Sequence, residues 1–419
     1  MPFDRTPILH EYNRLGDYNP DHYNFHIGAP HPSELILCSK IVEKAVASIA
    51  EQPASLRSSA FQYGYEFGAD PVLDSLAGFL SSELNHEIKA ENLMITAGSS
   101  LAFSMVCTRM FSHRGSKRPI LFVEHPTYFL IIDSAQHHGF QVETIPTTAE
   151  GKIDFKKWEK LICELGLFNA VSTEEGTHRA MVYLVPTFRN PNGESLAKDD
   201  AHEVLSLITE HNMLLYSDDV YSILYFGNEP PQRIFPVGQS DLVISAGTFS
   251  KLLGPGLRVG WIESTPKVVE RLSNTGFVVS GGCMAQFSSF IIERAIVNGS
   301  LSCHVKDLRR TYKEKAHAIK AAFESGLPEG VKWKVPQGGY FVWLILPANY
   351  SQTYITNVLV PEANKLNLRF GIGARSCPAL KVGEPCELGC GRALRLSLGH
   401  VTANQIPKGI RQLCELLTL

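Results

Sequence analysis

The sequence predicts an α/β protein with a larger domain built on a mainly parallel sheet and a smaller α+β domain. The 419-residue chain is long enough for two or three domains. Short, continuously apolar runs alternate with helix-like segments through its middle, which is typical of parallel strands covered by helices on both faces. From about residue 285 a long helical segment followed by strands replaces this alternation, and this change indicates the second domain.

The N-terminal part of the chain comes before the first expected strand. Residues 1–35 are rich in Pro, Tyr, Asn and His without a regular period, so we expect an irregular arm there. Apolar spacing is helical over residues 34–54 and stops at Pro53. Residues 61–70 combine aromatic residues with glycines, which indicates an ordered loop before a helix at residues 71–84.

The strands of the larger domain are expected at six short apolar runs, which are residues 93–96, 119–123, 181–185, 213–217, 242–246 and 258–262. Sheets of this type bind their ligands at the carboxyl ends of the strands. A helix up to residue 325, strands within 331–346 and at 394–398, and a closing helix are expected in the smaller domain. We therefore expect an N-terminal arm with part of the smaller domain, then the larger domain, then the smaller C-terminal domain, at residues 1–55, 56–285 and 286–419.

Composition and charge exclude several classes of protein. Hydrophobic residues make up 44% of the chain and charged residues 19%, which indicates a folded globular protein. A net charge of −3 favours neither nucleic acid nor an anionic membrane as partner, and no apolar segment reaches membrane-spanning length. Nine scattered cysteines, and an N-terminus without a signal or transit pattern, predict reduced thiols in a cytoplasmic protein. Cys386 and Cys390 lack zinc-ribbon spacing, so we expect no metal.

The most informative segment is SAGTFSKLLGPGLRVGW, residues 245–261. It presents Lys251 between an apolar strand and a glycine turn, where a desolvated lysine with a lowered pKa is suited to Schiff-base chemistry. The hydroxyl groups of Thr248 and Ser250 and the guanidinium of Arg258 are suited to holding a phosphate. The glycines lack the spacing of a dinucleotide-binding loop, so we do not expect an NAD-dependent dehydrogenase.

Two further strand ends carry polar groups. Asp218 and Asp219 follow one strand, with Tyr221 close behind, and Asn190 begins an Asn-Pro-Asn-Gly turn after another. Taken alone, paired acids are often residues at a helix start, and the turn is ordinary turn chemistry. Combined with the lysine and the arginine, at the carboxyl ends of different strands, they form a constellation typical of pyridoxal phosphate enzymes.

Over nearly its whole length the sequence resembles the fold type I, class I/II pyridoxal phosphate-dependent aminotransferase family, most closely its aromatic and 2-aminoadipate branch. The motifs are IGAP at 27–30, QYG at 62–64, AGSS at 97–100, EHPTY at 124–128, NPNG at 190–193, DDVY at 218–221, GTFSKLLGPGLRVGW at 247–261, QGGYFVW at 337–343 and RLSLG at 395–399. The resemblance implies a seven-stranded, mainly parallel sheet and a homodimer with shared active sites. It also implies amino transfer between an aromatic, 2-aminoadipate or similar L-amino acid and a 2-oxo acid such as 2-oxoglutarate.

The resemblance also implies roles for single residues. Lys251 would hold pyridoxal phosphate covalently and act as acid and base. Asp218, with Asp219 as the alternative, would pair with the pyridine nitrogen, and Tyr221 and Asn190 would bind the ring oxygen. The cofactor phosphate would be held by residues from several loops, namely Ser99, Ser100, Thr248, Ser250, Arg258 and, from the neighbouring subunit, Tyr63.

The resemblance assigns the substrate side of the site as well. Tyr128 would stack on the cofactor ring, Arg395 would clamp the substrate α-carboxylate, and Gly28 and Asn190 would lie near the substrate. The turn Asn-Pro-Asn-Gly replaces the family's usual Asn-Pro-Thr-Gly, and residues 374–390 have an individual character expected of a substrate-side loop. A C-S β-lyase on the same cofactor is the alternative function. A ligand sensor fused to a DNA-binding module is disfavoured, because no basic helix-turn-helix region precedes the motifs.

Overall fold

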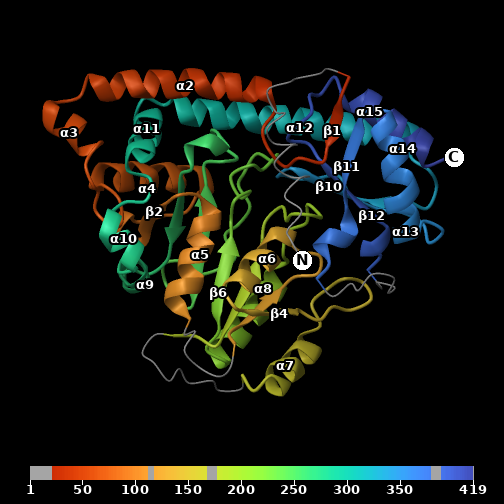
Figure 1. The fold of residues 1–419 in the computed structure, drawn as a ribbon, viewed down its shortest axis with the longest axis horizontal. Helices are drawn as coiled ribbons and strands as arrows, with labels where there is room; N and C mark the ends of the chain where they lie inside the picture. Colours follow the sequence, from red (N-terminus) through yellow and green to blue (C-terminus); the bar gives the residue numbers. More distant parts are fainter. Residues whose placement is uncertain (1–20, 112–117, 168–176, 379–387, 419) are drawn as a thin grey trace.

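The computed structural model describes residues 21–111, 118–167, 177–378 and 388–418, which form two sheets surrounded by helices (Figure 1). The larger sheet has the order β2-β8-β7-β6-β5-β3-β4, and the smaller has the order β1-β11-β12-β10-β9. No helix in the described ranges combines the length and apolar content needed to cross a bilayer.

The seven-stranded sheet is mainly parallel, as predicted. Strands β4, β3, β5, β6 and β7 run parallel to one another. β8 is antiparallel to both of its neighbours, β7 and β2. The strands are β2 (Leu93–Thr96), β3 (Ile120–Val123), β4 (Gln141–Thr144), β5 (Ala180–Leu184), β6 (Leu214–Asp218), β7 (Val243–Thr248) and β8 (Gly260–Glu263). The six predicted runs match six of these strands. The apolar pattern missed β4, a partly exposed edge strand with only one apolar residue.

Successive residues of the central strands point to opposite faces of this sheet. Phe122 of β3 and Val182 of β5 pack with Trp158 on one face, while Leu121 and Met181 belong to the core on the other. The helices of this part of the chain are α3 (Ala54–Ser59), α4 (Asp70–Leu84), α5 (Ser99–Met110), α6 (Phe129–His137), α7 (Phe155–Glu164), α8 (Lys198–Glu210), α9 (Pro266–Ser273) and α10 (Gly276–Gly281).

The five-stranded sheet is built from both ends of the chain. Its strands are β1 (Tyr23–Phe25), β9 (Lys332–Trp333), β10 (Phe341–Ile345), β11 (Leu368–Ile372) and β12 (Ala393–Ser397). β1 pairs in parallel with β11, and the other pairs are antiparallel. The irregular arm expected over residues 1–35 is therefore wrong in its described part. A three-residue strand is too short to show a period, and β1 depends on β11, which lies more than 300 residues away in sequence.

The remaining helices lie beside this smaller sheet or, like α2 and α11, extend over the larger part of the chain (Figure 1). They are α2 (Pro32–Ala50), α11 (Gln286–Val297), α12 (Ser300–Gly326), α13 (Gln352–Tyr354), α14 (Val360–Lys365) and α15 (Ile406–Leu416). The single helix expected from residue 285 to 325 is two helices, because the chain turns at Asn298 and Gly299, where Gly299 has a φ of 73°. α11 packs against both α2 and α4, so it links the N-terminal helix to the larger part of the chain.

Candidate active site

A cavity of about 340 Å³ lies at the carboxyl ends of the parallel strands, between the two sheets. Residues from β6, from the loops after β2, β5 and β7, and from β10 and β12 line it. It brings together twelve of the thirteen residues predicted from the sequence, namely Gly28, Ser99, Ser100, Tyr128, Asn190, Asp218, Tyr221, Thr248, Ser250, Lys251, Arg258 and Arg395. Tyr63 is the exception, since its side chain is 78% exposed on the loop before α4.

Lys251 follows β7 and projects its amine into this cavity. Its Nζ donates a hydrogen bond of 2.6 Å to the carbonyl oxygen of Gly28. Desolvation, followed by the positive charge of Arg395, lowers the pKa of Lys251 from 10.5 to about 8, although the carboxylate of Asp218 acts in the opposite direction. The amine is therefore largely available as a nucleophile and proton acceptor in mildly basic solution.

Asp218 is the last residue of β6 and lines the same cavity. Tyr183 donates a hydrogen bond of 2.5 Å to its Oδ2. Its Oδ1 is buried and has no hydrogen-bond partner among the described residues. Burial raises the pKa of Asp218 to about 7, and the neighbouring Asp219 adds to this rise. A buried carboxylate oxygen without a partner is costly, so this position fits a ligand that brings a positively charged N–H group.

Asp219, the alternative for this role, lies elsewhere. Its Oδ2 accepts a hydrogen bond of 2.5 Å from Ser245, and the residue lines a separate small cavity that includes Arg233 and Glu263. Neighbouring residues of an extended strand point to opposite faces, and this explains why only one of the paired acids reaches the large cavity. The geometry thus favours Asp218.

An anion-binding cradle forms where the loop after β2 meets the turn before β8. Ser99 and Ser100 are the first residues of α5, where unpaired backbone N–H groups attract a negative charge. Arg258 Nη2 donates to the carbonyl oxygen of Ala97 at 3.2 Å, and its Nη1 lies 3.5 Å from Ser250 Oγ. Thr248 Oγ1 in turn donates to Ser250 Oγ at 3.0 Å. Hydroxyls, a guanidinium and a helix N-terminus therefore converge on one corner of the cavity.

Glycines allow these two loops to approach closely. Gly98 has a φ of 88°, and a Cβ there would lie 2.6 Å from Arg258 Nη2. A Cβ on Gly260 would lie 2.7 Å from the carbonyl oxygen of Gly247 and 2.9 Å from Gly98 Cα. Both contacts are shorter than a real Cβ tolerates, so the shape of the cradle requires glycine at both positions.

Arg395 of β12 lines the same cavity, and only 7% of its surface is exposed. Its Nη1 donates to Asn190 Oδ1 at 3.0 Å and its Nη2 to the carbonyl oxygen of His26 at 2.8 Å. The guanidinium lies 4.6 Å from the ring centre of Phe341. These contacts hold the side chain in place, and a buried guanidinium of this kind matches the geometry of a carboxylate.

Three aromatic and backbone features complete the walls. Tyr221 is buried against Tyr340 and Phe341, with ring centres 5.7 and 5.8 Å away. Tyr128 precedes α6 and lines the cavity next to Phe129. Gly28 sits so close to Phe341 that a Cβ would approach its ring to 2.8 Å, so any larger residue there would reshape the cavity.

Two residues at the site were missed by the sequence reasoning. Tyr183 is a fully buried residue of β5, and nothing in its local pattern distinguishes it from a core aromatic. Arg375 lines the cavity from the segment predicted as a substrate-side loop, and its guanidinium lies 5.1 Å from the ring centre of Phe129. A basic residue in that segment was the signal that could have found it. Lys381 and Cys386 of the same segment lie outside the described residues.

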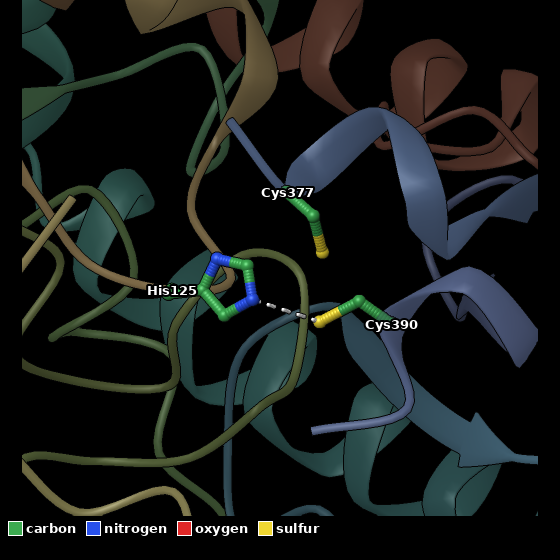
Figure 2. A group of neighbouring side chains, drawn as sticks. All are labelled: His125, Cys377 and Cys390. Carbon is green, nitrogen blue, oxygen red and sulfur yellow. Dashed lines mark hydrogen bonds between the residues drawn. The ribbon is translucent and has the colours of Figure 1, made fainter. Parts of the chain in front are cut away.

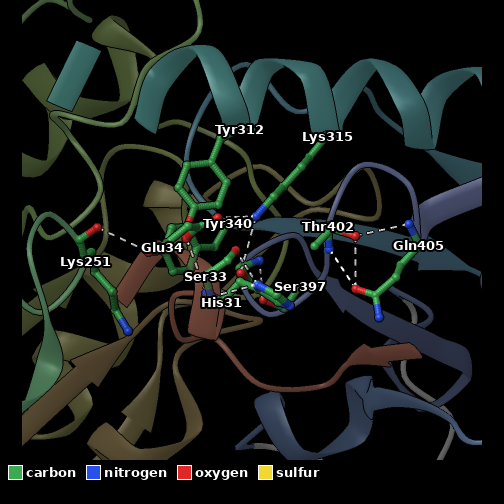
Figure 3. Close-up of polar contacts among 11 residues, drawn as sticks. His31, Ser33, Glu34, Lys251, Tyr312, Lys315, Tyr340, Ser397, Thr402 and Gln405 are labelled. Atoms are coloured by element: carbon green, nitrogen blue, oxygen red, sulfur yellow. Dashed lines mark hydrogen bonds and ion pairs between the residues drawn. The ribbon is translucent and has the colours of Figure 1, made fainter. Parts of the chain in front are cut away.

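A buried polar network packs against the backbone of Lys251 (Figure 3). Tyr340 Oη donates to the carbonyl oxygen of Lys251 at 3.2 Å. Tyr312 and Lys315, both on α12, donate to the two oxygens of Glu34 on α2 at 2.8 and 2.6 Å. The backbone at Lys251 is therefore packed against side chains that also hold α2 in place.

The fold and this cavity together define a class of enzyme. An amine with a lowered pKa, a buried acid with an open oxygen and an anion cradle match the aldehyde, the ring nitrogen and the phosphate of pyridoxal phosphate. The residues present therefore fit this cofactor.

Comparison with known proteins gives the family. Residues 24–412 match the family described as "aminotransferase class I and II". Aromatic-amino-acid aminotransferase 1 of Thermococcus litoralis is 28% identical over 93% of this chain and 86% of its own length. The 2-aminoadipate transaminase of Thermus thermophilus is 28% identical over 94% and 89%. The crystal structure of Pyrococcus horikoshii kynurenine aminotransferase, in complex with PMP, is 26% identical, with a TM-score of 0.79 over 100% of this chain and 95% of that one.

The chain belongs to the class I and II aminotransferase family. It has the fold type I architecture and is a pyridoxal phosphate-dependent transaminase. The fold, the enzyme class and the cofactor predicted from the sequence are thereby confirmed.

Proposed function

We propose that this enzyme moves an amino group between an aromatic, 2-aminoadipate or similar L-amino acid and a 2-oxo acid such as 2-oxoglutarate. The observation that carries the proposal is that Lys251, Asp218 and Arg395 line one cavity and lie close enough for the charges of Asp218 and Arg395 to act on the Lys251 amine. The substrate classes named for the similar archaeal and bacterial proteins support the donor range.

The cofactor would be held at both ends of its ring. Lys251 would bind it covalently, and Oδ1 of Asp218 would accept a hydrogen bond from the protonated ring nitrogen. Tyr221 and Asn190 would bind the ring oxygen, and Tyr128 would stack on the ring. The phosphate would be held by the cradle of Ser99, Ser100, Thr248, Ser250 and Arg258. When bound, pyridoxal phosphate supplies an electron sink that stabilises negative charge at the substrate Cα.

The protein's own groups then perform the proton transfers. The amine of Lys251 would accept the proton from the substrate Cα and return a proton on the cofactor side, and its pKa of about 8 leaves a fraction of the amine unprotonated near neutral pH. Asp218 would stay negatively charged beside the ring nitrogen, because the protonated ring would satisfy its open oxygen. Tyr183 holds the other oxygen and so keeps the carboxylate in one orientation.

Two arginines divide the recognition of the substrate. Arg395, fixed by Asn190 and by the carbonyl oxygen of His26, pairs with the α-carboxylate. Arg375 offers a second positive charge over the ring of Phe129. The guanidinium of Arg375 suits a distal carboxylate, as in 2-oxoglutarate or 2-aminoadipate. Together with the ring of Phe129 it also suits the aromatic side chain of the alternative donors.

The enzyme would work as a cytoplasmic homodimer. Phe61, Tyr63 and Tyr65 are 76%, 78% and 70% exposed on one loop, and Phe277 and Val279 on α10 are about half exposed. Exposed apolar groups of this size are typical of a protein interface, and Tyr63 would reach the partner's phosphate cradle. The eight described cysteines carry no disulfide, which supports a reducing compartment. We further propose the domain divisions at residues 55 and 285.

The covalent role of Lys251 can be tested directly. Reduction of the holoenzyme with borohydride, followed by digestion and mass spectrometry, should locate a phosphopyridoxyl group on Lys251. Lys251→Ala should lose this label and at least a thousandfold in turnover, whereas Lys306→Ala, on an exposed face of α12, should retain both. Normal turnover by the Lys251→Ala variant would refute the mechanism.

The reaction type is tested by supplying single amino acids. An aminotransferase given one donor and no oxo acid should stop after one equivalent of oxo acid per active site. Continuous release of ammonia and pyruvate from a cysteine conjugate would instead mark a β-lyase. A panel of aromatic, 2-aminoadipate and aliphatic donors, each with 2-oxoglutarate, then ranks the substrates.

A further inference from the structure

Three potential metal ligands converge beside the active-site cavity but outside its lining (Figure 2). His125 follows β3, Cys377 follows the short helix η4 (Gly373–Ser376), and Cys390 begins the short helix η5 (Cys390–Arg392). The ligand atoms of the three residues lie within 4.8 Å of one another, and Cys390 Sγ is 3.7 Å from His125 Nε2. Figure 2 shows the sulfur of Cys390 directed towards the imidazole and the sulfur of Cys377 directed towards that of Cys390.

The surrounding structure holds these side chains in place. Cys377 and Cys390 are 4% and 1% exposed and pack in one apolar cluster with Trp343 and Ala393. The backbone N–H of Thr127 donates to the carbonyl oxygen of Ser376 at 2.8 Å, so the segments carrying His125 and Cys377 are linked directly. The ligands therefore come from a preformed arrangement, which lowers the cost of binding a cation.

The spacing of the ligand atoms, all within 4.8 Å of one another, is close to that around one ion with soft ligands. Zinc binds cysteine sulfur at about 2.3 Å and histidine nitrogen at about 2.0 Å, so a tetrahedral ion places two sulfurs about 3.8 Å apart and a sulfur and a nitrogen about 3.5 Å apart. The observed 3.7 Å between Cys390 and His125 is already close to this value. Thiolate and imidazole ligands select zinc over magnesium or calcium, which prefer oxygen.

We propose that His125, Cys377 and Cys390 form a zinc site, with a water molecule as the fourth ligand. Binding replaces the two thiol protons with the metal, so two protons are released for each zinc bound. The sequence spacing could not reveal the site, because more than 250 residues separate His125 from Cys377. The pair considered from spacing, Cys386 and Cys390, is not the pair proposed.

The position of the site gives it a consequence for the cavity. Tyr128 lies three residues after His125, and Arg375 lies two residues before Cys377, and both line the active-site cavity. A bound zinc ion would therefore tie these two walls together. Zinc binding would not depend on which amino donor the enzyme uses, because His125, Cys377 and Cys390 lie outside the cavity lining.

The test uses the holoenzyme, purified under a reducing agent and without a histidine tag. Zinc added and then removed from weak sites by gel filtration should remain at one ion per chain, measured by plasma mass spectrometry. Competition with a chromogenic chelator should show that His125→Gln, Cys377→Ser and Cys390→Ser each lower the affinity for zinc by at least about 100-fold. The matched control Cys303→Ser, at an exposed cysteine of α12, should bind as the unmodified protein does.

Cobalt provides a second readout that does not depend on enzyme activity. Cobalt-loaded protein should show the thiolate charge-transfer absorption expected for cysteine ligands, and each cysteine variant should weaken it. Less than half an ion per chain in the unmodified holoenzyme, or equal affinity in the three variants and the control, would overturn the proposal. A disulfide between Cys377 and Cys390 in place of bound metal would overturn it as well.

Discussion

Lys315 Nζ lies 2.6 Å from Glu34 Oε1, and the two side chains are only 2% and 9% exposed. This buried ion pair joins α12 to the N-terminal end of α2. Tyr312 donates to the other oxygen of Glu34, and Tyr340, which contacts the backbone of Lys251, lies 4.8 Å from the ring centre of Tyr312. The helix that follows Gly28 is thus anchored by the same cluster that contacts the backbone of Lys251 (Figure 3).

Lys315→Met should therefore destabilise the protein strongly. The methionine keeps most of the packing volume but leaves the Glu34 carboxylate buried without its cation, which costs about 3–5 kcal/mol. The free energy of unfolding, measured in urea, gives this loss. Combining the change with Glu34→Gln should recover part of it, because the uncompensated charge is then removed.

The control for this prediction is an exposed ion pair on the same helix. Lys320 and Glu324 are 3.7 Å apart and 48% and 60% exposed. Lys320→Met should change the free energy of unfolding by less than about 0.5 kcal/mol. Similar losses in the Lys315 and Lys320 variants would show that burial of the pair is not what matters.

Asp218 should make the stability of the cofactor-free protein depend on pH. The pKa of Asp218 is raised from 3.8 to about 7 in the folded protein. Between pH 3.8 and pH 7 the folded state therefore keeps a proton on this carboxyl group that the unfolded state has lost. The stabilisation by this group is complete below pH 4 and is lost as the pH rises through 7. Asp218→Asn, which carries no charge, should therefore unfold with a free energy higher by on the order of 2–4 kcal/mol at pH 8 and nearly unchanged at pH 4.5.

Urea unfolding of both proteins at several pH values checks this. A difference that stays constant from pH 4.5 to pH 8 would contradict the assignment of the raised pKa to Asp218. Cofactor binding should show the opposite preference, because only the carboxylate can neutralise a protonated ring nitrogen. The same substitution should therefore weaken the retention of pyridoxal phosphate.

The parts of this molecule that could be predicted from sequence are those with a local signal. Continuous apolar runs marked six strands of the large sheet, because strands buried on both faces leave no room for polar residues. β1 and β11 carry no such signal, since each is defined by its partner. The site motifs were predicted because Lys251, Asp218 and Asn190 each follow a strand, and parallel strands end at one edge.

The missed residues are those whose role depends on tertiary contacts alone. Tyr183 is recognisable only from its 2.5 Å contact with Asp218, which lies 35 residues away. Glu34 and Lys315 are separated by 281 residues, and each alone resembles an ordinary charged position on an amphipathic helix. A single sequence does not report which distant residues meet, so buried pairs of this kind become visible only in the folded chain.

Gly98→Ala should damage the phosphate cradle specifically. The residue has a φ of 88°, and its new Cβ would lie 2.6 Å from Arg258 Nη2, so the guanidinium must move away from Ser250. We expect the dissociation constant for pyridoxal phosphate to rise by at least about tenfold, measured by equilibrium dialysis.

Gly139→Ala is a matched control for this change. Gly139 has a similar φ of 78° but no atom within 4 Å of the new Cβ. Gly139→Ala should lose about 1 kcal/mol of stability from the strained backbone. Gly98→Ala should lose about 1–3 kcal/mol, because its φ of 88° and ψ of 165° are essentially restricted to glycine. Only the Gly98 variant should lose affinity for the cofactor, and equal losses in both would indicate a general effect of destabilisation.

Arg395→Lys should separate substrate binding from cofactor binding. A lysine keeps the charge but cannot make two parallel hydrogen bonds to a carboxylate, and it also loses the contacts to Asn190 and to the carbonyl oxygen of His26. We expect kcat/KM for the amino acid to fall on the order of 100-fold, with cofactor content unchanged. Arg369→Lys, an exposed position on the neighbouring strand β11, should leave both quantities unchanged. Loss of cofactor from the Arg395 variant, rather than a rise in KM, would show that this arginine maintains the cavity instead of binding the α-carboxylate.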